Sequence, residues 1–177
     1  MTQTKKVQKN WSYTQKIWAP ILVPLPETIS MTNPVFRNNS RVLLDSNILI
    51  YALNKNEPKS AQATKFITAA KNSCIAQQNV LETMRILTHP SFPESMSGSE
   101  IQRSIASIIE YFPVISPNEQ TLYVFNHLVD IYKPTSNKIF DTYLVATALS
   151  NGIRTIVTDN EKDFRQFEQI EVLNPFS

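Results

Sequence analysis

Glycine, cysteine and histidine are scarce in this sequence. The 177 residues include two glycines, one cysteine and two histidines. Neither Gly98 nor Gly152 lies between the first predicted strand and its helix, which excludes the pyrophosphate loop of a dinucleotide-binding domain. The lone Cys74 excludes an internal disulfide and a cysteine-based metal cluster, and it indicates a reducing compartment. His89 and His127 have no neighbours at metal-ligand spacing and are interpreted as ordinary residues.

Long apolar runs and a strong net charge are also missing. No stretch approaches the roughly 20 apolar residues that span a bilayer, and residues 1–30 lack the apolar core of a signal peptide. We therefore expect a cytoplasmic protein with no membrane contact. The net charge of +2 is too balanced to predict nucleic-acid binding from bulk electrostatics. A chain of 177 residues with 42% hydrophobic content favours one sizeable core.

The sequence divides into a basic arm, residues 1–40, and a domain, residues 41–177. Four lysines against Glu27 give the first 30 residues a net charge of +3. Three prolines disfavour regular structure there: Pro20, Pro24 and Pro26. Two interpretations stay open. The arm packs its aromatic residues on the domain or on a partner, or the natural start is Met31 and the arm is an over-extended reading frame.

The domain opens with an apolar run, Val42–Leu44, that leads into Asp45. An apolar run without alternation is typical of a strand buried on both faces, as in parallel sheets covered by helices. Asp45 would then lie at the carboxyl end of that strand, where open α/β sheets bind their ligands. The structural alternative is that Asp45, followed by Ser46 and Asn47, caps the next helix.

Strands and helices are expected to alternate along the rest of the domain. Further strands are predicted at 73–76, 112–115, 154–158 and 170–173, with Pro113 indicating an edge strand. Helices are predicted at 48–53, 61–71 (with Pro58 in its first turn), 79–87, 99–109, 117–129 and 139–149. Three of these helices are predicted to bury apolar stripes. The stripes include Leu81 and Leu87 in helix 79–87, Ile101 to Ile109 in helix 99–109, and Leu122 and Leu128 in helix 117–129.

Four acidic residues occupy comparable places in this pattern. Asp45 and Asp159 end strands, Glu82 follows a strand near the start of a helix, and Asp141 stands in the first turn of an apolar helix. Parallel strands would bring all four to one sheet edge. Crowded carboxylates repel unless a cation neutralises them, and oxygen ligands suit Mg²⁺ or Mn²⁺. Such ions serve phosphodiester hydrolysis. The structural alternatives are an ion pair of Glu82 with Arg85 and a helix-dipole contact of Asp141.

Four segments resemble, in order, the four motifs of the PIN-domain ribonucleases, in particular the VapC toxins of toxin–antitoxin pairs. They are Leu43–Tyr51, Val80–Glu82, Phe140–Ala148 and Thr158–Phe164, and the resemblance spans about residues 41–175. It implies a three-layer α/β/α sandwich with a mainly parallel central sheet. It also implies an Mg²⁺- or Mn²⁺-dependent endoribonuclease, an antitoxin that blocks the acidic cleft, and a homodimer, for which the helices at 97–131 offer apolar surface.

The resemblance assigns roles to individual residues. Asp45 and Asp141 would be the principal metal ligands, and Glu82 a further ligand or the holder of metal-bound water. Ser46 and Asn47 match small polar positions that orient Asp45. At the fourth motif the match loosens: relatives place Asp or Asn where this chain has Asn160. We predict Asp159 as the fourth acid, with Asp163 as the substitute.

Several alternatives concern function. Candidate RNA contacts are the basic residues that flank the motifs: Arg85, Lys133, Lys138, Arg154 and Lys162. A phosphoacceptor-aspartate protein is disfavoured because Asn47 stands where its phosphatase form needs a second Asp. A stand-alone RNA-processing nuclease stays open, and so does a catalytically silent PIN-like binding module, although the retained acids argue against the latter.

Overall fold

The computed structural model describes residues 41–70 and 72–177, so the predicted arm and the alternative start at Met31 lie outside the described residues. Its core is a five-stranded sheet in which every neighbouring pair is parallel, with the order β3-β2-β1-β4-β5. The strands are β1 (Val42–Leu44), β2 (Ser73–Ala76), β3 (Val114–Ile115), β4 (Thr155–Val157) and β5 (Glu171–Leu173). All five strand predictions are confirmed, and β3, which follows Pro113, is an edge strand as expected.

Helices connect the strands in the predicted alternation. They are α2 (Ser46–Leu53), α3 (Ser60–Ala69), α4 (Gln77–Leu87), α5 (Gly98–Tyr111), α6 (Thr121–Tyr132), α7 (Lys138–Ser150) and α8 (Glu161–Phe164). Ser97 caps α5, with Glu100 completing a capping box. The prediction that Pro58 lies in the first turn of α3 is wrong, because Pro58 lies in the turn before that helix. Across the described ranges, none of the helices combines the length and the apolar character that crossing a bilayer requires.

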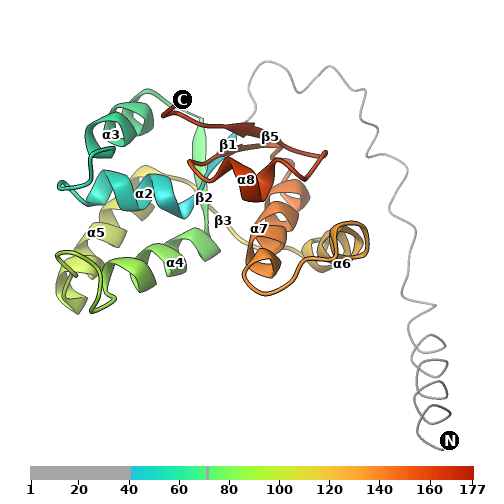
Figure 1. The fold of residues 1–177 in the computed structure, drawn as a ribbon, viewed down its shortest axis with the longest axis horizontal. Helices are drawn as coiled ribbons and strands as arrows, with labels where there is room; N and C mark the ends of the chain where they lie inside the picture. Colours follow the sequence, from blue (N-terminus) through green and yellow to red (C-terminus); the bar gives the residue numbers. More distant parts are fainter. Residues whose placement is uncertain (1–40, 71) are drawn as a thin grey trace, which may run out of the picture. The chain divides into compact units, whose positions relative to one another are not determined.

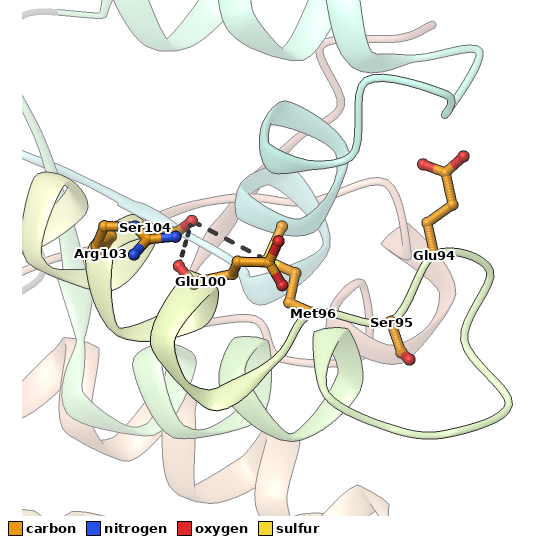
Figure 2. Close-up of a pocket in the computed structure, with 6 residues that line it drawn as sticks. All are labelled: Glu94, Ser95, Met96, Glu100, Arg103 and Ser104. Carbon is orange, nitrogen blue, oxygen red and sulfur yellow. Dashed lines mark hydrogen bonds between the residues drawn. The ribbon is translucent and has the colours of Figure 1, made fainter.

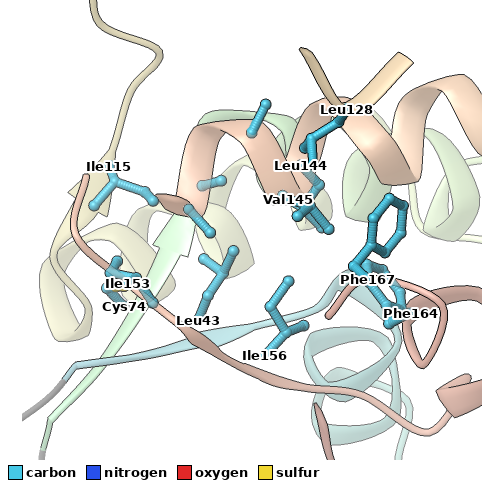
Figure 3. Packing of buried hydrophobic residues seen from close by; sticks show 13 residues of the cluster. Leu43, Cys74, Ile115, Leu128, Leu144, Val145, Ile153, Ile156, Phe164 and Phe167 are labelled. Carbon is cyan, nitrogen blue, oxygen red and sulfur yellow. The ribbon is translucent and has the colours of Figure 1, made fainter. Parts of the chain in front are cut away.

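Successive side chains of a strand point to opposite faces of the sheet, so both faces carry apolar groups. Helices cover both faces. Leu43, Cys74 and Ile156 pack with Leu144 and Val145 of α7 in one cluster, which also takes in α6 and α8 (Figure 3). Leu44, Ile75 and Val157 pack with α2, α4 and α5 on the opposite face. Figure 1 shows α2 to α5 on one side of the strands and α6 and α7 on the other. This arrangement confirms the predicted three-layer α/β/α sandwich.

The predicted acidic site lies next to β1, where the strand order changes direction: β2 and β3 follow on one side of β1, and β4 and β5 on the other. Central β1 pairs with β2 on one side and with β4 on the other, in the register Leu43↔Cys74 and Leu43↔Ile156. Such a switch point leaves a crevice beyond the carboxyl ends of parallel strands. The segments that follow β1, β2 and β4 therefore meet at one edge, as the parallel arrangement predicted.

Three apolar residues that we assigned to the core are exposed. Leu81 is 68% exposed, Leu122 65% and Ile109 49%. On α4 the buried positions are the predicted Leu87 and two polar residues, Asn79 and Thr83. The Asn79 side chain accepts a hydrogen bond from the Ala76 backbone at 3.0 Å, which turns a polar face of α4 inward. The stripe prediction is confirmed for the residues that are buried: Leu87, Ile101, Ile105, Ile108 and Leu128. It is wrong for the three exposed residues, and on α4 polar side chains take part of the inward face.

Candidate functional site

Asp45 follows β1 directly and caps α2, so both interpretations of this residue describe its position. Its side chain is 6% exposed. One oxygen accepts from the Ser46 backbone at 2.7 Å, and the other accepts from Asn47 Nδ2 at 2.9 Å and Thr158 Oγ1 at 2.7 Å. Burial and, to a smaller extent, the charge of Glu82 raise the pKa of Asp45 to about 6, while the hydrogen bonds from Thr158 and Ser46 oppose the rise. Asp45 is therefore a rigidly held, partly destabilised carboxylate.

Glu82 joins Asp45 through a serine hydroxyl. Ser46 Oγ donates to Glu82 Oε2 at 2.9 Å, while the predicted ion pair with Arg85 is long, at 3.9 Å. The Glu82 side chain is 37% exposed, so such a loose surface pair contributes little stability. Glu82 thus reaches the Asp45 site from α4 and keeps one face open to solvent.

Asp141 stands in the first turn of α7, on the opposite side of the sheet from α2 and α4. Burial, together with the charges of Asp163, Asp45 and Glu82, raises the pKa of its carboxyl to about 6, while the nearby positive charge of Lys138 opposes the rise. Within the described residues, no side chain donates a hydrogen bond to this carboxylate. The charged groups that act on Asp141 are thus three other acids and one lysine.

Asp159 has a different environment. Its Oδ2 atom accepts from Lys59 Nζ at 2.5 Å and from Tyr51 OH at 2.9 Å. Burial tends to raise the pKa of Asp159, but these hydrogen bonds and the charge of Lys59 lower it overall. Asp163 in α8 is instead the acid whose charge acts most on Asp141, and Asn160 Nδ2 holds its carboxylate through a short hydrogen bond.

The predicted orienting residues lie beside Asp45, and the structure adds Thr158 to them. Ser46 and Asn47 both donate to the Asp45 carboxylate. Thr158 is fully buried, donates to Asp45 and accepts from Asn47 Nδ2 at 2.9 Å. We missed Thr158 as a functional residue. Its signal is the position directly after β4, the strand that pairs with β1.

The donor set fits a hard divalent cation. Asp45, Glu82, Asp141 and Asp163 offer only carboxylate oxygens, the ligands that Mg²⁺ and Mn²⁺ prefer. Each of the other three raises the pKa of Asp141, which a cation would reverse. As placed, no three carboxylate, imidazole or thiol side chains of residues 41–70 and 72–177 are gathered closely enough to hold an ion. Binding of a cation by these acids would require the less buried Glu82 and Asp141 side chains to move closer to Asp45.

The hollow drawn in Figure 2 lies away from the acids, between the loop before α5 and the first turns of that helix. It has a volume of about 470 Å³ and its lining includes Met96, Glu100 and Arg103. Ser104 Oγ donates to the Glu100 carbonyl at 3.1 Å within it. None of the predicted site residues lines this hollow.

Most of residues 41–177 are similar in sequence or fold to known proteins. The PIN domain family model matches residues 42–170. Ribonuclease VapC48 of Mycobacterium tuberculosis is 26% identical over 140 residues, which cover 75% of this chain and 96% of that protein. Among solved structures, VapBC-1 from nontypeable Haemophilus influenzae has a TM-score of 0.57 and 24% identity, covering 77% of this chain and 98% of that one.

Two further structures share the fold at lower identity. VapBC2 from Rickettsia felis, solved with a fragment of promoter DNA, has a TM-score of 0.58 and 16% identity, covering 75% of this chain and 97% of that one. VapC20 of Mycobacterium tuberculosis, described as a toxin that cleaves the sarcin-ricin loop, has a TM-score of 0.54 and 13% identity, covering 73% and 98%. Because the family model spans more than half of the residues, this chain belongs to the PIN domain family.

Proposed function

We propose that the protein is a divalent-metal-dependent endoribonuclease and the toxin of a toxin–antitoxin pair. The observation that carries the proposal is that acids from separate segments meet at one edge of the sheet: Ser46 Oγ links Glu82 to Asp45, and the charges of Asp163, Asp45 and Glu82 all act on Asp141. The relative VapC48 is named a ribonuclease, and several solved relatives are toxin–antitoxin complexes. The lone buried Cys74 suits action in the cytoplasm.

In this proposal Asp45, Glu82, Asp141 and a fourth acid hold Mg²⁺ or Mn²⁺, with Asp163 favoured over Asp159 by its charge effect on Asp141. When bound, such an ion activates water and offsets phosphate charge during phosphodiester hydrolysis. Ser46, Asn47 and Thr158 keep the Asp45 carboxylate in one orientation by donating to it. Exposed Lys138, one turn before Asp141, supplies positive charge for an RNA phosphate.

The proposed protein partners would bury apolar residues that are exposed in this chain. Exposed Leu81 and Phe140 directly precede Glu82 and Asp141 in sequence, and exposed Ile139 stands two residues before Asp141; Phe140 is 63% exposed. An antitoxin that covers the acids would also shield these apolar side chains from water. A homodimer would use the exposed apolar residues of α5 and α6: Ile109, Tyr111, Leu122, Tyr123 and Ile131.

The test is cleavage of a mixed RNA pool by the purified protein with Mg²⁺, with Mn²⁺ and with EDTA, beside calorimetric titration of Mn²⁺. Asp45→Asn and Asp141→Asn are expected to lose cleavage by at least about 100-fold and to bind Mn²⁺ weakly, because each removes a ligand charge. Asp130→Asn is the matched control, since Asp130 is an exposed carboxylate of α6. Folded wild type that binds neither Mn²⁺ nor RNA would contradict the nuclease and favour a silent binding module.

A further inference from the structure

Asp159 takes part in a contact that joins distant segments of the chain. Lys59 Nζ and Tyr51 OH both donate to its Oδ2 atom, at 2.5 Å and 2.9 Å. Tyr51 belongs to α2, Lys59 directly precedes α3, and Asp159 follows β4. The Asp159 side chain is only 18% exposed and that of Lys59 39%. The pair is thus partly withdrawn from water, where an ion pair is screened less than on the surface.

Two aromatic rings hold the lysine in place. Its Nζ atom lies 5.5 Å from the centre of the Tyr51 ring and 5.0 Å from that of Phe176. The two rings meet edge to face, with 5.5 Å between their centres. Gln62 Nε2 donates to the Pro175 carbonyl at 2.7 Å, which fixes the segment that carries Phe176. Cation–π contacts and these hydrogen bonds limit where the ammonium group can go.

The loop that carries Asp159 also contacts the acid site. Thr158 Oγ1 donates to Asp45 at 2.7 Å, and the Asp159 backbone donates to Asn47 Oδ1 at 3.3 Å. The Asn160 backbone donates to Thr158 Oγ1 at 3.0 Å, and its side chain holds Asp163. One side of the loop therefore faces Asp45, and the Asp159 carboxylate ties the same loop to α2 and to the start of α3.

We propose that Lys59, Tyr51 and Asp159 are positioning residues that clamp the loop between β4 and α8, so that Thr158 and Asp163 stay at the metal site. Asp159 itself does not bind the metal, since a cation at its Oδ2 atom would meet the ammonium group of Lys59. The inference rests on the proposed function, because it assigns the clamp to that site. It also separates the role of Asp159 from that of Asp163, the acid whose charge acts most on Asp141.

The test compares Mn²⁺ affinity by calorimetry and RNA cleavage in Lys59→Met, Asp159→Asn, the double variant of both, and the charge swap Lys59→Asp with Asp159→Lys. Loss of an outer partner typically weakens metal binding about 10-fold or more. We expect each single variant to weaken Mn²⁺ binding by about 10-fold, the double variant to be no weaker than either single one, and the swap to recover most of the affinity. Lys65→Met, an exposed lysine of α3, is the matched control and should bind as wild type does.

The outcomes separate the clamp from its alternatives. If Asp159 were a ligand, the swap would bind no Mn²⁺, Lys59→Met would bind as well as wild type or better, and Asp163→Asn would keep full affinity. Unfolding of the same variants by urea in EDTA tests the clamp without metal, and additive effects of Lys59→Met and Asp159→Asn would overturn it. Failure of wild type to bind Mn²⁺ would instead overturn the proposed function.

Discussion

Asp45 is buried and Asp141 partly buried, and both have a raised pKa, yet their surroundings differ. Asp45 accepts hydrogen bonds on both oxygens, and Thr158 and Asn47 need that acceptor. Asp141 has no such donor among the described residues and lies near Asp163, Asp45 and Glu82. Asp141→Asn therefore removes the repulsion between Asp141 and the other acids and leaves no hydrogen-bond donor without its acceptor. Asp45→Asn, in contrast, can place an amide N–H group against the donors Thr158 and Asn47.

Asp141→Asn is expected to stabilise the metal-free protein at pH 7.5 and to change little at pH 4. The pKa of Asp141 is about 6 in the folded state against 3.8 for the unperturbed group. The folded protein thus holds more protons between these values, and its free energy of unfolding falls as the pH rises through that window. The expected gain is on the order of 1 kcal/mol, because partial exposure reduces the effect. Urea unfolding in EDTA at both pH values measures it.

Asp130→Asn is the control for that measurement, since Asp130 is exposed on α6. A loss of stability in Asp141→Asn at pH 7.5, or an equal gain at both pH values, would contradict the electrostatic account of Asp141.

At the scale of elements, α4 shows how one helix serves both the core and the site. Leu87 is 1% exposed, Asn79 and Thr83 are fully buried, and Leu81 is 68% exposed. Glu82 follows Leu81 and reaches Ser46. The buried polar face near the start of α4 sets the rotation of the helix, and this rotation places Glu82 toward Asp45 and Leu81 toward solvent.

Two leucines of α4 should therefore respond very differently to truncation. Leu87→Ala is expected to lower the free energy of unfolding by about 2–5 kcal/mol, because it leaves a cavity in the core. Leu81→Ala is expected to change it by about 0.5 kcal/mol or less, as is usual for exposed positions. Urea denaturation of both variants in the same buffer checks this, and equal losses would mean that Leu81 faces the core after all.

Sequence predicted the fold at this scale well and the contacts between elements poorly. Apolar runs ending in Asp45 or Thr158 identify strands because a strand buried on both faces needs such runs. The rotation of α4 depends on Asn79, whose capping role involves the backbone of Ala76 and not an apolar pattern. The pairing of Asp159 with Lys59 joins residues 100 positions apart, so no local pattern reveals it.

For the molecule as a whole, the acids place partly desolvated and mutually repelling charges at one edge of the sheet. Asp45 and Asp141 carry raised pKa values, so at neutral pH their ionisation opposes folding. A bound cation would remove this cost and would also stabilise the folded state by mass action.

Mn²⁺ should therefore raise the thermal stability of the wild type. At a free concentration of 100 times the Kd, the expected stabilisation is about 2.7 kcal/mol. Differential scanning calorimetry across a Mn²⁺ series measures it. Asp45→Asn should show a much smaller rise, and the surface variant Asp130→Asn a full one. Equal rises in all three proteins would place the bound ion elsewhere.

The strand order has a consequence for how the protein is made. Thr158 and Asp45, which touch at 2.7 Å, are 113 residues apart, and β4 pairs with β1 only across that interval. A nascent chain leaves the ribosome from its amino end, so β1 emerges long before β4. The proposed acid site would therefore stay incomplete during synthesis, because the carboxylate of Asp45 exists long before the hydroxyl of Thr158 that orients it.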